Sequence, residues 1–117
     1  MSKSNFLLTR QAARTLRDIH KYSEKQWGPE TADKYMADLY AAMKQAAVKP
    51  ENGQLRAHRA VPFLMVAVRE HFIVYDRIEK DIVILTLLNQ RRDIERVISE
   101  LEPSFLIEIK RLRESMA

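Results

Sequence analysis

Apolar residues recur with two different periods along this chain, and the change from one to the other falls near residue 60. After a short apolar run at residues 6–8, they return every three or four positions up to residue 48, which is the period of a helix that buries one face. Between residues 62 and 88 they form short runs rich in valine, isoleucine and leucine, which is typical of β-strands. The pattern predicts an α+β fold in which a helical hairpin packs on a small, mainly antiparallel sheet.

The helical part of the pattern predicts one short strand and then two helices. Phe6-Leu7-Leu8 is long enough for the strand, and the Thr9 hydroxyl can accept a hydrogen bond from an early N–H of the first helix. Gly28 ends that helix and Pro29 suits the first turn of the next, so we expect an antiparallel hairpin. The expected buried stripes comprise Ala12, Leu16, Ile19, Ser23 and Trp27 in the first helix, and Ala32, Tyr35, Leu39, Ala42, Met43 and Ala46 in the second.

A stop signal and a turn signal separate the helices from the strands. The second helix is expected to end near Val48, because Lys49 precedes Pro50 and a residue before proline disfavours the helical conformation. Residues 51–60 are then predicted to be a surface loop, with Asn52-Gly53 as a turn within it.

Three strands are predicted after this loop, at about residues 62–69, 72–78 and 82–88. The turn at residues 79–81 is short, so the last two strands should pair antiparallel. The last strand is apolar at nearly every position, which indicates a central strand that is covered on both faces, or on one face by a partner.

The C-terminal region predicts two helices. Residues 91–101 have helical periodicity, Pro103 breaks the pattern, and Ser104 is a candidate cap for a final helix. The expected order of elements is therefore β-α-α-β-β-β-α-α. We expect one domain over residues 1–117, of which residues 103–117 form an extra C-terminal helix.

Composition favours a cytoplasmic protein. The 117 residues include no cysteine, which excludes disulfides and thiolate metal sites and fits a reducing compartment. We expect no secretory signal and no membrane segment, since no apolar stretch approaches the ~20 residues of a membrane helix. The net charge of +4 arises in the first fifty residues, which carry nine Lys and Arg against five Asp and Glu. This excess indicates either a solvated basic helix face or attraction to an acidic partner.

No motif for phosphate binding, metal binding or hydrolysis occurs in the sequence, so we expect no cofactor and no metal. Of the scattered histidines, His71 is expected to support a tight turn by hydrogen bonding, with proton transfer as the alternative. Trp27 is expected to pack at the base of the helical hairpin, with a role as a partner anchor as the alternative. His20 is expected at the boundary or the surface, with catalysis as the alternative, and His58 lies in the predicted loop and indicates little. The tyrosines are expected at the core or the boundary and not as nucleophiles; they are Tyr22, Tyr35, Tyr40 and Tyr75.

Arg69, Arg91 and Arg92 lie at the ends of predicted strands, where neighbouring strand ends can come close together. Guanidinium groups bind phosphate and carboxylate through two hydrogen bonds at once, so such a group of arginines suits an anionic target. The alternative is local ion pairing with Glu70, Asp93 or Glu95.

Several short pieces of the sequence occur in an order and spacing that are specific when taken together. They are Ala12-Ala13 with Leu16 and Ile19, Gln26–Glu30, Ala32 with Tyr35, Lys49-Pro50, His71–Tyr75 and Gln90–Ile94. Through them the chain resembles, over about residues 5–98, the ParE-family toxins of type II toxin–antitoxin systems, within the RelE/ParE superfamily.

The resemblance implies a RelE/ParE-like fold and a toxin that causes growth arrest and serves functions such as plasmid maintenance. ParE toxins are known to poison DNA gyrase by stabilising its complex with cleaved DNA. A cognate antitoxin, ParD-like or another DNA-binding dimer, would neutralise the toxin, and operator DNA would be reached only through that antitoxin. The related RelE toxins instead cleave mRNA in the ribosome.

The residues of the RelE branch bear on enzymatic activity. That branch typically has an arginine in the third strand, an arginine after the last strand and a tyrosine in the last helix. The corresponding positions here hold Phe72, Arg91 and Val97, so two of the three functional groups are missing. The resemblance therefore implies a gyrase poison with no catalytic residues. The alternatives are a ribosome-dependent mRNA endoribonuclease with unusual residues, or a toxin-like fold with a different target.

Charge and position in the sequence indicate candidate residues for binding the target, DNA gyrase, and the antitoxin. Candidate contacts to the target are Arg69, Arg91 and Arg92. Candidate contacts to the antitoxin are Arg10, Arg14, Arg17, Lys21, Trp27 and Tyr40.

Overall fold

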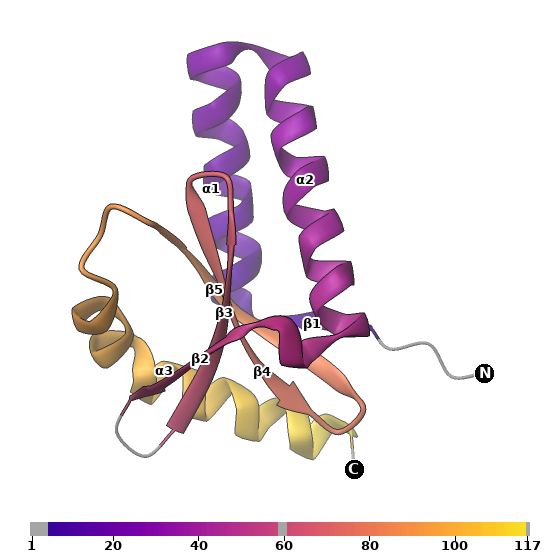
Figure 1. Cartoon of the computed structure of the whole chain (residues 1–117), viewed down its shortest axis with the longest axis vertical. Helices are drawn as coiled ribbons and strands as arrows, with labels where there is room; N and C mark the ends of the chain where they lie inside the picture. The colour runs from indigo at the N-terminus through magenta and orange to yellow at the C-terminus, as the bar shows by residue number, and fades with distance from the viewer. Residues whose placement is uncertain (1–4, 59–60, 117) are drawn as a thin grey trace.

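A computed structural model describes residues 5–58 and 61–116 of the chain, which form three layers (Figure 1). Helices α1 (Arg10–Trp27) and α2 (Pro29–Val48) form an antiparallel hairpin that packs on one face of a sheet. Helix α3 (Ile94–Met116) covers the opposite face. The predicted α+β class, with a helical hairpin on a small sheet, is confirmed.

The described residues form a five-stranded sheet in the order β1-β5-β4-β3-β2. Strand β1 is parallel to β5, and every other pair is antiparallel. Strand β5 lies between β1 and β4, and both of its faces are buried. A strand covered on both faces has no solvent-facing positions, which explains its continuous apolar run. The strands are β1 (Phe6–Leu8), β2 (Gln54–His58), β3 (Val61–Val68), β4 (His71–Ile78) and β5 (Asp81–Asn89).

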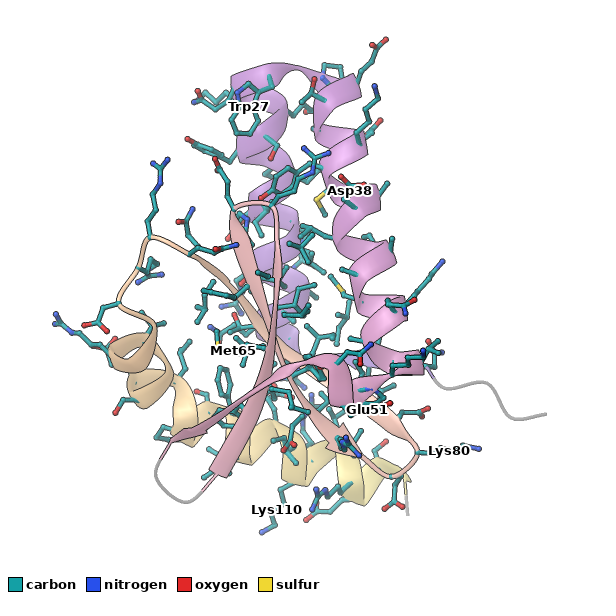
Figure 2. The ribbon with its side chains drawn as sticks, viewed as in Figure 1. Trp27, Asp38, Glu51, Met65, Lys80 and Lys110 are labelled. Atoms are coloured by element: carbon teal, nitrogen blue, oxygen red, sulfur yellow. The ribbon has the colours of Figure 1, made fainter. Side chains whose placement is uncertain are left out.

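Each face of the sheet contributes to its own core. The hairpin side contains Leu16, Leu39 and Met43 of the helices against alternate residues of the strands. The other side is closed by residues of α3, among them Phe105, whose ring meets that of Phe63 edge to face at 5.4 Å. Figure 2 shows Met65 inside the molecule, whereas Lys80 and Lys110 point outward. Alternation along the strands thus divides the apolar residues between two separate layers.

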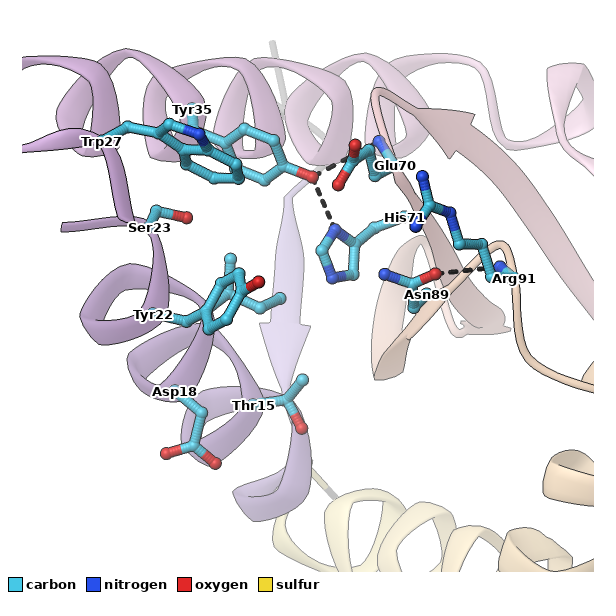
Figure 3. Close-up of a pocket in the computed structure, with 11 residues that line it drawn as sticks. Thr15, Asp18, Tyr22, Ser23, Trp27, Tyr35, Glu70, His71, Asn89 and Arg91 are labelled. Carbon is cyan, nitrogen blue, oxygen red and sulfur yellow. Dashed lines mark hydrogen bonds between the residues drawn. The ribbon is translucent and has the colours of Figure 1, made fainter. Parts of the chain in front are cut away.

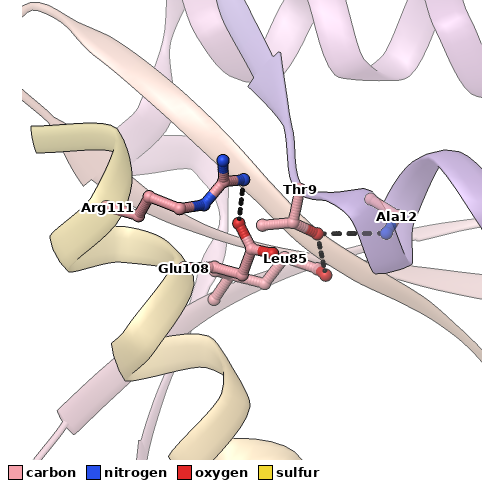
Figure 4. A network of polar contacts seen from close by, with 5 residues as sticks. All are labelled: Thr9, Ala12, Leu85, Glu108 and Arg111. Atoms are coloured by element: carbon pink, nitrogen blue, oxygen red, sulfur yellow. Dashed lines mark hydrogen bonds and ion pairs between the residues drawn. The ribbon is translucent and has the colours of Figure 1, made fainter. Parts of the chain in front are cut away.

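Thr9 connects the start of α1 to the centre of the sheet (Figure 4). Its Oγ1 accepts a hydrogen bond from the Ala12 N–H at 3.0 Å, as predicted for an N-cap. The same hydroxyl donates to the Leu85 carbonyl at 2.7 Å, and Leu85 is the extra residue of a bulge in β5. The side chain of Thr9 is buried, so one hydroxyl both caps a helix and satisfies an irregular strand.

The prediction of a loop at residues 51–60 is wrong. A 3-10 turn, η1 (Pro50–Asn52), is followed by strand β2, which pairs antiparallel with β3 through partners such as Leu55 and Leu64. The segment is an edge strand with only Leu55 and Ala57 apolar, and this short alternation directly after Asn52-Gly53 is a much weaker signal than the apolar runs of the later strands. Residues 59 and 60 of the predicted loop lie outside the described residues.

The predicted helix break at Pro103 is also wrong, since α3 continues through it and begins at Ile94 instead of residue 91. Proline removes one helical hydrogen bond, which weakens a helix without necessarily ending it. Val97 before Pro103 and Phe105 after it both pack on the same face of the sheet, and this shared burial holds the two halves in one helix. No helix in the described part of the chain has the length and apolar character of a membrane span.

Candidate functional site

A cavity of about 300 Å³ opens between the C-terminal half of α1 and the ends of β4 and β5 (Figure 3). We name it the Arg91 cavity. Tyr22, Ser23 and Trp27 of α1 line one wall, and Tyr35 of α2 lies beside them. The opposite wall comprises Glu70, His71, Asn89 and Arg91, and the remaining lining residues are Thr15, Asp18 and Ile19. The cavity thus combines aromatic, acidic and basic groups from four elements.

Tyr35 and His71 form the polar contact between α2 and the sheet. The Tyr35 hydroxyl lies 2.6 Å from Nδ1 of His71 and accepts a hydrogen bond from the Glu70 N–H at 3.3 Å. Burial lowers the pKa of His71, an effect that the Glu70 carboxylate opposes. Burial likewise raises the pKa of the Tyr35 hydroxyl. At neutral pH the neutral Tyr35 hydroxyl therefore donates a hydrogen bond to Nδ1 of a neutral His71, which supports the turn as the sequence predicts.

Arg69 is held against α2 and does not line the Arg91 cavity. It has a left-handed backbone with φ 52°, and its guanidinium pairs with Asp38 while lying 5.3 Å above the ring of Tyr35. The expected alternative of an ion pair with Glu70 is wrong, because Asp38 on α2 is nearer in space although distant in sequence. The Gln90 side chain donates to the Arg69 carbonyl at 2.8 Å and so closes the turn.

The turn after β5 directs its two arginines to different surfaces. The Asn89 side chain accepts a hydrogen bond from the Arg91 N–H at 2.9 Å, and the Asn89 carbonyl accepts one from the Arg92 N–H at 3.1 Å. Arg91 then lines the cavity, whereas Arg92 lies with Arg96 in a groove at the start of α3. The three predicted strand-end arginines consequently do not converge on one point.

Trp27 is half exposed, at 50%, so its predicted place in the buried stripe is wrong. The hairpin extends beyond the sheet at the end where Gly28 joins the helices, and no strand formed by the described residues lies there beside Trp27 (Figures 1 and 2). Its ring meets that of Tyr22 edge to face at 6.1 Å, and Tyr22 is 61% exposed. Figure 2 shows Trp27 at this tip. The two aromatic side chains form an open apolar wall.

A second groove is lined by residues of both helices of the hairpin and by Leu8 of β1. It brings together two predicted antitoxin contacts, Arg17 of α1 and Tyr40 of α2, above an apolar floor that includes Leu16 and Met36. The other basic candidates, Arg10, Arg14 and Lys21, are exposed on α1, and Trp27 lines the Arg91 cavity instead. His20 forms the rim of this groove and lies 3.2 Å from Asp33.

Two of the three positions that carry catalysis in RelE toxins are apolar and packed. Phe72 packs against the core beneath α3, and Val97 is buried within that core. Arg91, the third, is exposed. Within residues 5–58 and 61–116, no three His, Asp or Glu side chains are grouped as a metal site would require.

Sequence reasoning missed several residues of the Arg91 cavity. The sequence pattern predicts no binding role for Tyr22 or Glu70, and it places Asn89 just after the end of a predicted strand. Tyr22 has a weak signal in the sequence. It lies four residues after Asp18 and next to Ser23, so a helix places these polar and aromatic side chains close together. Glu70 and Asn89 gave none, because their nearness depends on the pairing of His71 with Asn89 across β4 and β5.

Three comparisons with known proteins agree with this geometry. Residues 6–94 match the model of a family described as the ParE toxin of the type II toxin-antitoxin system parDE. The chain is 27% identical over 95 residues to Toxin ParE1 from Mycobacterium tuberculosis, strains CDC 1551 and H37Rv, covering 80% of this chain and 96% of each relative. The fold resembles a solved structure of the chromosomal ParDE TA system from P. aeruginosa, with a TM-score of 0.64, 21% identity, and coverage of 74% of this chain and 96% of that one. The family match begins at β1 and ends where α3 begins.

Proposed function

Because the chain belongs to the ParE toxin family of type II toxin–antitoxin systems, we propose that it arrests growth by stabilising the complex of DNA gyrase with cleaved DNA. On this proposal the protein performs no chemistry. It acts by binding one state of the target enzyme more tightly than the others, which raises the population of that state. Replication then stalls at the cleaved sites.

The observation that carries the non-enzymatic part is the packing of Phe72 and Val97. A ribonuclease needs groups that take and give a proton and groups that neutralise phosphate charge. Phe72 and Val97 offer neither, and both contribute to the core beneath α3. Converting either position to a catalytic residue would place a polar group in an apolar layer, which costs free energy unless it is paired.

The target-binding surface on this proposal centres on the turn after β5. The guanidinium groups of Arg91 and Arg92 are exposed, and within the described residues neither forms an ion pair. Arginine is enriched among the residues that dominate protein interfaces, and it also binds DNA phosphates. Arg69 contributes from the neighbouring turn, where its pairing with Asp38 holds the backbone in place.

The antitoxin-binding surface on this proposal is the groove along the helical hairpin. An amphipathic antitoxin helix would lay its apolar face on Leu16 and Met36, and its acidic residues would meet Arg17 and the exposed basic residues of α1. Tyr40 would be its aromatic anchor. The antitoxin, and not the toxin, would contact operator DNA.

The decisive experiment is a gyrase cleavage assay with purified, antitoxin-free protein, ATP and supercoiled plasmid, read as linear DNA after detergent and protease. A parallel reaction contains translating ribosomes and labelled mRNA. We expect linear DNA to accumulate while the mRNA stays intact. Cleaved mRNA with unaffected gyrase would establish the ribonuclease alternative, and inactivity in both reactions would assign a different target.

The antitoxin surface is tested by Tyr40→Ala with Arg17→Glu, measured as the dissociation constant for the cognate antitoxin. We expect weakening of at least about tenfold, because one aromatic anchor and one charge pair are lost. Lys44→Ala, an exposed change on the same helix outside the groove, is the matched control. Unchanged affinity of the folded double variant would place the antitoxin elsewhere.

A further inference from the structure

The two walls of the Arg91 cavity differ in chemistry, and together they match one kind of ligand. We propose that this cavity binds a single unpaired nucleobase, with a preference for guanine, and holds the attached phosphate at Arg91. This site goes beyond the proposed action on gyrase, since it would bind the base in a free nucleotide or in an unpaired strand.

The α1 wall provides a stacking surface. Trp27 and Tyr22 meet edge to face and are 50% and 61% exposed, so part of each side chain is open to a planar ligand. Stacking on aromatic side chains is how proteins commonly hold unpaired bases. Aromatic rings that only supported the fold would be covered by other elements, as those of Phe63 and Phe105 are.

Between the two aromatic residues lies a polar group that faces the cavity without a partner. Ser23 is 2% exposed, lines the cavity, and its hydroxyl makes no hydrogen bond with any residue of the described segments. Figure 3 shows the hydroxyl directed from α1 toward the opposite wall. Buried hydroxyl groups are nearly always hydrogen-bonded, so this one indicates a ligand that offers a donor or an acceptor.

The opposite wall supplies the specificity. Figure 3 shows the Glu70 carboxylate and the Arg91 guanidinium across the cavity from Trp27 and Tyr22. Within the described residues the Glu70 carboxylate has no ion-pair partner, and it accepts hydrogen bonds only. Guanine is the base whose pairing edge carries two adjacent donors, N1–H and the N2 amino group, and a carboxylate accepts both. Arg91 then suits the phosphate, because guanidinium binds phosphate oxygens in pairs.

The size of the cavity sets a limit on the ligand. Its volume of about 300 Å³ lies at the lower end for small-molecule sites, which fits one nucleotide and excludes a base pair within a duplex. The second carboxylate, Asp18, lies on the α1 wall at the far end from Arg91 and so leaves the phosphate position free of direct repulsion (Figure 3).

Trp27 makes the test direct, because it is the only tryptophan and gives a single indole N–H resonance. The shift of that resonance is followed by NMR while the full chain is titrated with guanosine, adenosine or cytidine monophosphate. Guanosine monophosphate should bind most tightly and adenosine and cytidine monophosphate at least about tenfold more weakly, since they lack the paired donors. Equal shifts with all three nucleotides, or none with any, would overturn the proposal.

Two further titrations identify the source of the guanine and test for a different kind of ligand. Short thymidine strands with and without one central guanine report on binding within a strand, and guanosine monophosphate reports on the free nucleotide. Binding of either guanine source supports the site and identifies which source it accepts. If arginine amide shifts the indole resonance and guanine does not, the cavity binds a basic side chain of a partner protein, and the proposal is overturned.

Variants connect the shift to the residues. Glu70→Gln should reduce the preference for guanine about tenfold, whereas Arg91→Ala should weaken guanosine monophosphate and leave guanosine unchanged. Glu114→Gln and Lys44→Ala, on exposed positions of α3 and α2, make the same charge changes away from the cavity. Equal effects of cavity and control variants would show non-specific attraction and refute the site. No gyrase is present, so the result is independent of the proposed target.

Discussion

The Tyr35 hydroxyl lies 2.6 Å from Nδ1 of His71 and connects the N-terminal half of α2 to the first residue of β4. The two rings meet edge to face with their centroids 5.8 Å apart. The same hydroxyl accepts the Glu70 N–H, so a single oxygen fixes the turn between β3 and β4 against the hairpin. This turn carries one side of the Arg91 cavity.

This contact predicts a dependence of stability on pH. Burial lowers the pKa of His71 below its ordinary value of 6.5, so the unfolded chain binds a proton before the folded one does. The free energy of unfolding should therefore fall as pH decreases from 6.5 through the lowered pKa of folded His71. Urea denaturation across pH 5 to 7.5 measures this decrease, and His71→Gln should lessen it.

The pKa of Asp76 also differs between the folded and unfolded chain, so the free energies of unfolding of the unaltered protein and of His71→Gln must be compared at each pH. Burial raises the pKa of Asp76 above 3.8, so its protonation on acidification favours the folded state and acts in the opposite sense. The difference between the unaltered protein and His71→Gln cancels this contribution. An identical pH profile for both proteins would show that His71 does not titrate with folding.

Tyr75 occupies the space that a side chain at residue 53 would need, so this position requires glycine. An added Cβ at residue 53 would fall on the Tyr75 hydroxyl and lie 2.7 Å from Cζ, and that hydroxyl donates to the Pro50 carbonyl at 2.8 Å. We expect Gly53→Ala to lower the free energy of unfolding by about 2 kcal/mol through overpacking. Chemical denaturation of Gly53→Ala, Tyr75→Phe and the double variant should give less than additive losses, and full additivity would exclude the clash.

Thr9 predicts a second stability effect. Thr9→Val keeps the shape but removes both the cap to Ala12 and the donor to Leu85, so we expect a loss of about 2 kcal/mol. Thr9→Ser retains the hydroxyl and should lose clearly less. Thermal or urea unfolding of the two variants distinguishes the roles of hydroxyl and methyl groups, since equal losses would mean that the hydrogen bonds contribute nothing.

Arg91→Ala with Arg92→Ala tests the proposed target surface. The folded double variant should no longer arrest growth and should need at least about tenfold more protein to produce linear DNA, since two exposed interface arginines are lost. Antitoxin affinity should be unchanged. Lys110→Ala with Arg113→Ala removes the same charge from exposed positions of α3 and serves as the control. Full toxicity of the Arg91 and Arg92 variant would exclude this turn from the target interface.

Local signals in the sequence were sufficient for much of the fold. The cap at Thr9, the junction at Gly28 and Pro29, and the period of apolar residues are properties of adjacent positions, and all three occur as predicted. The run from Ile82 to Leu88 indicated a central strand because burial on both faces leaves no polar positions. The position of Arg91 directly after that strand is likewise evident from the sequence, and its role at a target surface stays a prediction.

The errors arose where the outcome depends on distant segments. Strand β2 has only two apolar positions, Leu55 and Ala57, and directly follows the Asn52-Gly53 turn signal, so it forms chiefly because β3 offers its edge. Pro103 lies inside a helix because residues on both of its sides pack on the sheet. Trp27 has the period of a buried residue, yet it lies at the hairpin tip beyond the sheet and is half exposed (Figure 2). Each case is a tertiary contact overriding a local preference, which sequence periodicity does not report.

By itself the sequence determined the class of fold, the helical hairpin, the central strand and the resemblance to ParE toxins, because each rests on local periodicity, capping or the order of short motifs. Only the tertiary structure decided which strands are neighbours and which side chains meet. Glu70, Asn89 and Trp27 line one cavity because strand pairing and helix packing bring three segments together. The physical reason is that a binding site is a property of distances in space, and those distances follow from the burial of the whole chain.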